Sequence, residues 1–235
     1  MVNYFAIYTI VNFRLREFFF EYHYSILAPI INNLIFIIVF STIDKFYNFT
    51  LNEISFIEFL VPGLIMMIVA QESFDNTSVS IINCKQVGSF DDFLYAPISR
   101  FELFLSYIFS QILIGLFIGI INLIILSFFI DFHFFSFFLF IYYLILVILF
   151  FSSIGLIVGF LSYTWDSQST VSNFFVVPIN FLSGTFFSIN SLPENFKFFL
   201  MYNPYYHIIT FFRDSFYGYY KFDFLINTFL FIFVV

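Results

Sequence analysis

The sequence feature that most constrains the fold is a succession of long apolar runs that begins near Ser25 and continues to the last residue. A run of about 20 mainly apolar residues is long enough to cross the hydrocarbon core of a bilayer as a helix. Because lipid cannot hydrogen-bond an exposed backbone, such runs must form structures that satisfy their own peptide groups. The chain is therefore predicted to be an all-α integral membrane protein.

Composition supports this prediction and excludes several function classes. Of 235 residues, 62% are hydrophobic and only 10% are charged, whereas soluble domains carry roughly 25% charged residues. A net charge of −7 argues against nucleic acid as a partner. The single cysteine, Cys84, cannot form an internal disulfide, and the three histidines are too far apart in sequence for a metal site.

Six spans are expected, preceded by one helix at the membrane surface. The N-terminal stretch, residues 1–23, mixes apolar residues with charged ones, so it is predicted to lie in the interface rather than to form a short tail. The predicted spans are residues 25–43, 56–82, 101–130, 134–161, 170–189 and 222–235. The last is too short to cross a bilayer, so we expect the sixth span to be truncated.

The connections carry little orientation signal. Lys and Arg divide evenly between the two sides of this topology, so the positive-inside rule does not orient it. The longest connection, residues 190–221, contains apolar pieces at Phe196–Met201 and His207–Phe212. We expect short helices there that enter the membrane from outside without crossing it, because irregular backbone at that depth must be covered by protein or water.

Ionisable residues within a span are functional candidates by default. Glu72 and Asp75 lie on one face of the second span, where they are predicted to line a translocation path or gate, or otherwise to be hydrated or paired. Small residues four apart let helix backbones approach closely. Such pairs occur at Gly115–Gly119 and Gly155–Gly159, and packing within the chain is favoured over a dimer contact.

The connection between the second and third spans predicts a short bounded helix. Ser89 is a favourable N-cap with Asp92 three residues on, and Pro97 ends a helix at or before Ala96. The helix, Phe90–Tyr95, is interpreted as a docking element for a soluble partner, or alternatively as a loop helix resting on the membrane. The predicted docking segment comprises Ser89, Phe90, Asp91, Asp92, Phe93, Leu94, Tyr95, Ala96 and Pro97.

Four segments in the same order resemble the ABC-2 family of ATP-binding-cassette permeases. Phe59–Met66 is similar to the family's F-L-x-P-G-L-I-M motif, and Gly88–Ser99 is similar to its cytoplasmic segment ending in A-P-x-S. Leu182–Phe187 resembles the signature after the fifth span. The remaining similarity lies at Leu192-Pro193, Asn203-Pro204 and Arg213.

The resemblance implies a six-transmembrane-helix ABC-2 permease, similar to type V exporters, in the cytoplasmic (inner) membrane with its N-terminus in the cytoplasm. It implies that Phe90–Tyr95 is the coupling helix that contacts an ATPase subunit, and that residues 190–221 are external re-entrant helices. The residues assigned to that external region are Leu192, Pro193, Asn203, Pro204 and Arg213. Those assigned to a translocation path or gate are Glu72, Asp75, Gly184, Phe186 and Phe187.

In this interpretation the working unit contains two permease subunits, expected to be a homodimer, and two ATPase subunits. The chain has no G-x-x-x-x-G-K-[ST] motif, so ATP and Mg²⁺ are expected to bind the partner and no cofactor is expected on this chain. The cargo class implied is amphiphilic, glycan, lipid-linked or drug-like.

Two other functions compete with this one. An ion-coupled secondary transporter would use Glu72 and Asp75, and inverted repeats would be expected in the sequence, where none is seen. A membrane-embedded transferase would need Glu72, Asp75, Asp166 and Asp214 to converge on one site.

Overall fold

A computed structural model describes residues 3–47, 50–51, 54–129, 135–187 and 192–218. Within these residues the fold is helical, which confirms the predicted all-α class, apart from a two-residue strand pair between the second and third helices. Strands β1 (Thr50–Leu51) and β2 (Ile54–Ser55) are antiparallel, with Thr50 opposite Ser55. The expected sixth span, residues 222–235, lies outside the described residues, as does Lys221.

The chain up to Leu161 forms a helix at the N-terminus and then four long helices, with the short η1 and α4 between them. In chain order these are α1 (Tyr4–Phe20), η1 (His23–Leu27), α2 (Ala28–Tyr47), α3 (Phe56–Val87), α4 (Phe90–Tyr95), α5 (Arg100–Leu126) and α6 (Phe137–Leu161). Four helical stretches in the described residues are long and apolar enough to cross a membrane, namely His23–Asp44, Phe56–Val87, Arg100–Leu126 and Phe137–Leu161.

Capping residues explain where these helices begin. Ser55 and Ser99 each form a capping box with a glutamate three residues on, Glu58 and Glu102. Helix α6 begins after Ser136, whose side chain accepts a hydrogen bond from the Leu139 backbone N–H, and not at residue 134 as expected. At the other end, α3 runs past the expected Ile82 to Val87, and α5 ends at Leu126, before the expected residue 130.

In its described part, the expected span at residues 170–189 is not one regular helix. Helix α7 (Trp165–Val171) begins before the expected residue 170, because the side chain of Thr164 caps it. It continues through η2 (Ser172–Val176), α8 (Val177–Asn180) and η3 (Phe181–Thr185), where η marks π-helical turns. Pro178 has no N–H to donate, which interrupts the regular hydrogen-bond ladder. Gly184, at φ +75°, then ends the helical conformation.

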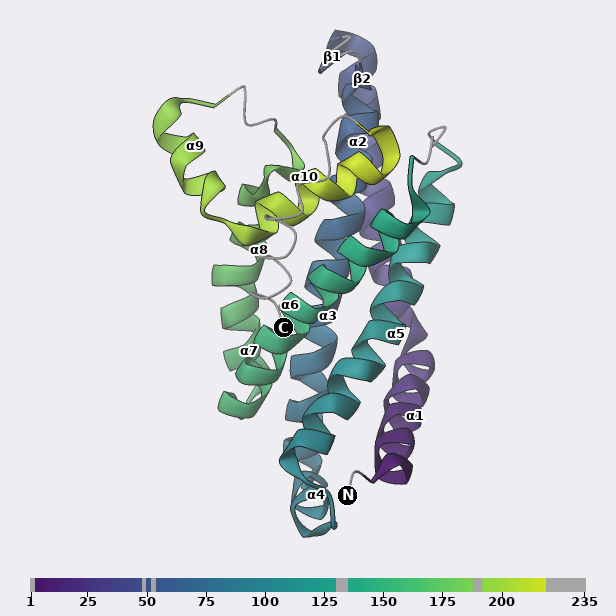
Figure 1. Cartoon of the computed structure of the whole chain (residues 1–235), viewed down its shortest axis with the longest axis vertical. Coiled ribbons are helices and arrows are strands. Elements are labelled where there is room, and N and C mark those ends of the chain that lie inside the picture. The colour runs from purple at the N-terminus through teal and green to yellow at the C-terminus, as the bar shows by residue number, and fades with distance from the viewer. Residues whose placement is uncertain (1–2, 48–49, 52–53, 130–134, 188–191, 219–235) are drawn as a thin grey trace.

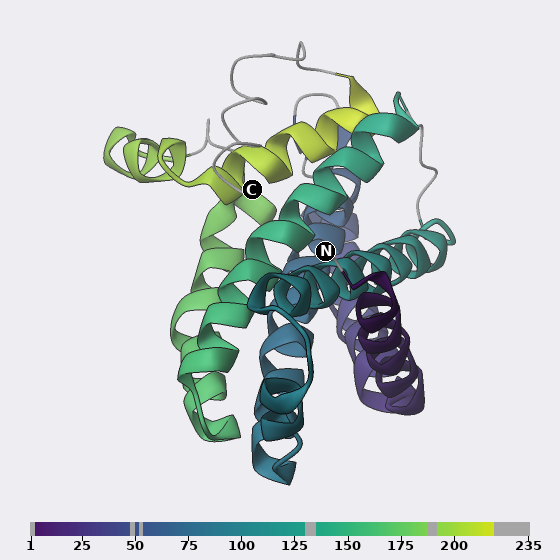
Figure 2. The same ribbon diagram turned by 60° about the horizontal axis from the view of Figure 1, so that its bottom comes forward.

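The long connection that follows contains two short helices, α9 (Glu194–Met201) and α10 (Pro204–Tyr217). Helix α10 lies across the end of the bundle at which β1 and β2 join α2 to α3 (Figure 1). Helix α4 lies at the opposite end, which also holds the start of α1 (Figure 1), and Figure 2 turns this end toward the viewer. The backbone N–H of Asn3 donates to the Glu102 carboxylate, which holds the N-terminal end of α1 beside the junction of α4 and α5.

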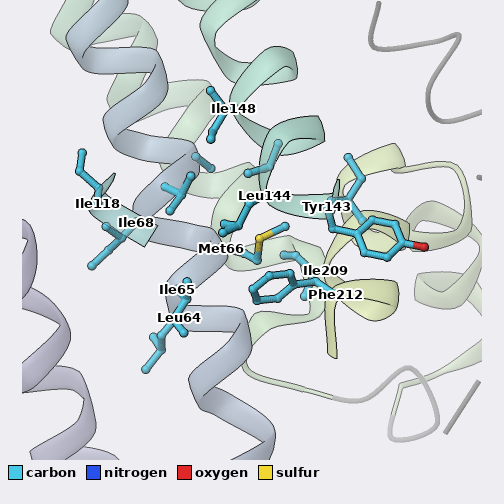
Figure 3. Packing of buried hydrophobic residues seen from close by; sticks show 14 of the residues in the cluster. Leu64, Ile65, Met66, Ile68, Ile118, Tyr143, Leu144, Ile148, Ile209 and Phe212 are labelled. Atoms are coloured by element: carbon cyan, nitrogen blue, oxygen red, sulfur yellow. The ribbon is translucent and has the colours of Figure 1, made fainter. Parts of the chain in front are cut away.

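Helix α3 is the centre of the packing. Its residues Val61, Leu64, Ile65 and Met66 are fully buried. Figure 3 shows α3 side chains facing Tyr143, Leu144 and Ile148 of α6, with Ile209 and Phe212 of α10 beside them. In lipid the hydrophobic effect does not drive helices together, so close van der Waals packing between these side chains stabilises the bundle.

The two glycine pairs pack within the chain, as predicted. A Cβ built at Gly155 would lie 2.7 Å from the Phe74 carbonyl oxygen of α3, and one at Gly159 would lie 3.1 Å from the Ser78 carbonyl oxygen. A Cβ at Gly115 would lie 2.7 Å from the Ile148 side chain of α6. The small residues therefore allow α3, α5 and α6 to approach closely.

Candidate functional site

Helix α4 is bounded on both sides, as the sequence predicts. Gly88, at φ +82°, ends α3, and Ala96 is extended before Pro97. The predicted Ser89 cap is wrong: Ser89 has helical backbone angles and makes no capping hydrogen bond. Its hydroxyl donates instead to the Cys84 carbonyl, at 3.3 Å. Because only two residues separate the helices, Ser89 serves the end of α3 rather than the start of α4.

One face of α4 is anchored and the other is free. Phe90 and Phe93 pack against a buried cluster formed by Ile10, Ile81, Tyr107, Ile108 and Leu156. Asp91 and Asp92 are exposed, and Tyr95 is 89% exposed. The side chain of Leu94 lies outside the described ones. Helix α4 therefore presents two carboxylates and an aromatic ring on a rigid base at one end of the molecule.

Lys85, in the last turn of α3, binds the C-terminal end of α6. Its ammonium donates to the carbonyl oxygens of Gly159, Phe160 and Ser162, at 2.8, 2.6 and 3.0 Å. The last carbonyls of a helix lack partners within the helix and attract a cation, so Lys85 caps α6 from outside. The Gln86 amide also donates to the Tyr163 carbonyl. The sequence did not predict this contact, because the expected second span ended at residue 82 and left Lys85 in the polar connection that follows it.

Helix α1 docks through charged residues. Arg14 is only 2% exposed, donates to the backbone and side-chain oxygens of Asn76 at 3.1 and 3.3 Å, and lies 4.5 Å from the Tyr107 ring centroid. Glu17 accepts a hydrogen bond from Ser80, at 3.1 Å. Burial lowers the pKa of Arg14 and raises the pKa of Glu17. Helix α1 is thus a packed element held by polar contacts to α3.

Asp75 belongs to a polar network that joins α3 to α7 and η2. Its carboxylate accepts hydrogen bonds from Gln71 at 2.6 Å, Gln168 at 2.7 Å and Ser172 at 3.3 Å. Gln71 in turn accepts one from Asn180 of α8, at 3.2 Å. Charge in a span is tolerated when polar partners surround it. The sequence flagged Asp75, but Gln168, which donates to Asp75, and Asn180, which donates to Gln71, carried no signal, because each lies about a hundred residues from its partner.

Glu72 points to a different environment, a cavity of about 200 Å³ between α2, α3 and α8. The cavity is lined by Pro29, Asn32, Asn33, Phe36, Met67, Ile68, Gln71, Glu72, Val177, Asn180 and Phe181. Phe186 lies beside it, stacked on Phe181 with ring centroids 5.2 Å apart. Phe187 is half-buried and has no described role here. The cavity therefore brings Glu72 and Phe186 into one region.

Arg213 joins two of the motifs singled out in the sequence. Its guanidinium donates to the carbonyl of Phe59 at 3.1 Å and to those of Gly184 and Thr185 at 2.9 Å each. It also lies 3.8 Å from the centroid of the Phe59 ring. Gly63 leaves room for this arrangement, since a Cβ there would lie 3.0 Å from the guanidinium. Arg213 thereby ties α10 to the start of α3 and to the end of η3.

The remaining predicted residues are structural in this arrangement. Asn203 caps α10 by accepting from the Tyr205 N–H at 3.0 Å, and Pro204 occupies its first turn. Leu192 and Pro193 directly precede α9. Asp166 is exposed on α7, whereas Asp214 is buried in α10 at the end of the bundle away from α4 (Figure 1). The four acids proposed for a transferase therefore belong to separate environments.

Comparison with known proteins adds an independent line of information. A family model described as ABC-2 type transporter matches residues 6–217. The inner membrane transport permease YadH of Escherichia coli K12 is 29% identical over 194 residues, covering 83% of this chain and 76% of YadH. The polysialic acid transport protein KpsM of Escherichia coli is 26% identical over 205 residues, covering 86% of this chain and 76% of KpsM.

Proposed function

The chain belongs to the ABC-2 type transporter family, and from this premise we propose that it is the membrane subunit of an ATP-driven exporter. It is an ABC-2 type permease, and helix α4 is proposed to be the element that a separate ATPase subunit engages. The observation that carries the proposal is the exposed face of α4, with Asp91, Asp92 and Tyr95 on a helix anchored by Phe90 and Phe93.

The contacts of Lys85 support a route from α4 into the membrane part. Lys85 and Gln86 connect the end of α3 to the end of α6 and to Tyr163, directly before α7. Helix α7 carries Gln168, which holds Asp75. In this proposal, ATP binding by the partner displaces α4, and α7 and the cavity beside it move with α4. The permease thereby changes from one of its two conformations to the other.

The proposed orientation takes the cytoplasmic N-terminus that the resemblance to ABC-2 permeases implies. The N-terminal end of α1 and α4 share one end of the molecule (Figure 1), so both are proposed to face the cytoplasm. Helices α9 and α10 then lie at the outer face of the inner membrane. Two copies of the permease, forming a homodimer, and two ATPase subunits that hold ATP and Mg²⁺ are proposed to form the exporter. The proposed cargo is an amphiphilic, glycan, lipid-linked or drug-like molecule.

Co-purification of the full-length permease with an ATPase subunit in mild detergent tests this function. We expect ATPase activity to co-elute with the wild-type permease and to be lost from it when Asp91 and Asp92 are both changed to Lys. The control is Glu194→Lys, which reverses the charge of one exposed acid, where the test variant reverses two, and lies in α9 at the opposite end. This control should keep the ATPase bound.

Two outcomes would overturn the proposal. The first is an ATPase that never co-purifies, combined with transport that follows a proton gradient, which would favour the secondary transporter. The second is equal loss of the ATPase in the α4 variant and in the Glu194→Lys control, which would mean that α4 has no special part in docking.

A further inference from the structure

The cavity beside Glu72 has a chemical character that the proposed function does not explain. Its walls are largely apolar, with Phe36 from α2, Met67 and Ile68 from α3, and Val177 and Phe181 from the broken helix. The polar groups that reach it are carboxamides and one carboxylate. Which hydrogen-bonding atoms of these groups remain free determines what the cavity can bind.

In the part of the chain that the structure describes, Asn33 has one unpaired acceptor, its side-chain oxygen. It is fully buried, and its amide nitrogen donates to the Asn122 side-chain oxygen at 3.1 Å. The Asn122 amide nitrogen donates in turn to the Ile118 carbonyl, at 3.0 Å. A carbonyl can only accept, so this chain of bonds sets the orientation of both amides. The Asn33 Oδ1 atom is left buried and without a partner among the described residues.

A hydrogen bond also fixes the orientation of the Asn180 amide, which belongs to α8. It is 2% exposed, and its amide nitrogen donates to Gln71 Oε1 at 3.2 Å. The Gln71 nitrogen is oriented by the Asp75 carboxylate, at 2.6 Å. The Asn180 Oδ1 atom is again buried and, among the described residues, unpaired. Because buried polar atoms nearly always have partners, two orphan acceptors lining one cavity indicate a missing donor.

The Glu72 carboxylate is the third acceptor. The described part of the chain provides no hydrogen-bond donor or cation to it, and the like charge of Asp75 lies three residues on in the same helix. No Lys or Arg is among the described residues that line the cavity. An uncompensated charge in apolar surroundings is costly, so a bound cation would stabilise this site.

Aromatic rings in and beside the cavity also favour a cation as the bound group. Phe181 stacks on Phe186, and Phe36 lies 6.0 Å from Phe186, centroid to centroid. Phe40 lies 5.5 Å from the same ring. The face of an aromatic ring attracts an organic cation, most strongly where water is excluded. Unpaired acceptors together with neighbouring aromatic rings suit an alkylammonium group better than an anion.

We propose that this cavity is a cargo subsite for the protonated amine headgroup of a cationic amphiphile. The proposal rests on the proposed export function and names a substrate class for it. The ammonium N–H groups donate to Glu72, Asn33 and Asn180, and the alkyl chain lies against the apolar walls. A volume of about 200 Å³ is smaller than a drug-sized site, so it fits a headgroup and not a whole amphiphile. A sugar hydroxyl could use the same acceptors but would gain nothing from the negative charge.

Binding of small probes to the permease–ATPase complex in phosphatidylcholine nanodiscs tests the subsite. Isothermal titration would compare hexylammonium, hexyl glucoside and hexanesulfonate, with empty nanodiscs subtracted. We expect hexylammonium to bind most tightly, and Glu72→Gln to weaken it by roughly tenfold to a hundredfold, the range for a hydrogen bond to a charged group. Glu72→Asp should retain part of the affinity, since it keeps the charge. Asp166→Asn, which removes an exposed carboxylate on α7, is the matched control and should bind normally.

The outcomes separate this proposal from the export function. Tightest binding of hexyl glucoside, or a hexylammonium affinity unchanged by Glu72→Gln, would overturn the amine subsite. The amine subsite would also be overturned if hexylammonium did not bind to a wild-type complex that still carries its ATPase. The export function would be unaffected by that result. A permease that never retains an ATPase would instead count against the export function.

Discussion

Replacing Gly155 by alanine should destabilise the helix bundle much more than the same replacement at Gly115. Both new Cβ atoms would approach an existing atom to 2.7 Å. At Gly155 that atom is the Phe74 carbonyl oxygen, with the Phe74 Cα and the Thr77 Cβ each at 3.3 Å. At Gly115 the close atoms are Cδ1 and Cγ1 of Ile148, which belong to a side chain that can shift more readily than a backbone carbonyl.

The magnitude follows from how far the backbone must move. Since Cβ contacts below 3.0 Å are essentially absent from real proteins, α3 and α6 must separate by about 0.5 Å, a gap that already forfeits roughly a quarter of each contact's attraction. Overpacking of this kind costs about 1–3 kcal/mol. Alanine's better helix propensity returns up to about 1 kcal/mol at both positions, so Gly155→Ala should lose about 1–2 kcal/mol and Gly115→Ala about none.

Thermal unfolding of the purified protein in detergent, followed by circular dichroism, checks this difference. For a chain of this length each kcal/mol corresponds to about 2–4 °C in Tm. We therefore expect Gly155→Ala to unfold several degrees below Gly115→Ala. Equal melting temperatures for the two variants would refute the argument that backbone contact, rather than proximity alone, sets the cost.

Further predictions concern Arg213 and Glu17. Arg213→Ala should cost about 1–3 kcal/mol in the same unfolding assay, because it removes the side-chain donor to three carbonyls. Arg213→Lys should recover only part of this loss, since an ammonium group cannot reproduce the planar fork of guanidinium donors. Full recovery of stability in Arg213→Lys would contradict the assigned geometry. Glu17 has a pKa raised above 4.5 by burial, so its charged form disfavours the folded state. That cost is absent below the unfolded pKa and grows as pH rises toward the folded pKa, so Glu17→Gln should stabilise the protein at neutral pH and lose this advantage in acid. A stability difference between wild type and Glu17→Gln that stays constant with pH in chemical denaturation would show that Glu17 does not titrate in this way.

The packing explains why some sequence motifs look unrelated until the chain folds. Phe59 and Gly63 lie in α3, Gly184 ends η3, and Arg213 lies in α10, yet the guanidinium contacts or approaches all of them. A side chain with a fork of donors can satisfy carbonyls from several segments at once. Their separation along the chain hides this shared role from any local pattern.

The described helices also show where local rules lose to tertiary context. Ser89 fits the sequence rule for an N-cap, but its hydroxyl reaches the Cys84 carbonyl instead. The sequence predicts one span over residues 170–189, but π-helical turns and Gly184 interrupt the regular helix there. Those turns place Ser172 and Asn180 in the network around Gln71 and Asp75.

The sequence by itself determined the membrane class, the helical fold and the bounded helix α4. These properties depend on hydrophobicity and on capping and breaking residues a few positions apart, so they are readable locally. Only the tertiary structure decided that Lys85 fastens α3 to α6, that Asp75 is saturated with donors, and that Glu72 faces a cavity with free acceptors. These properties depend on residues distant in sequence meeting in space, because a hydrogen bond or a cavity wall is defined by position and not by spacing along the chain.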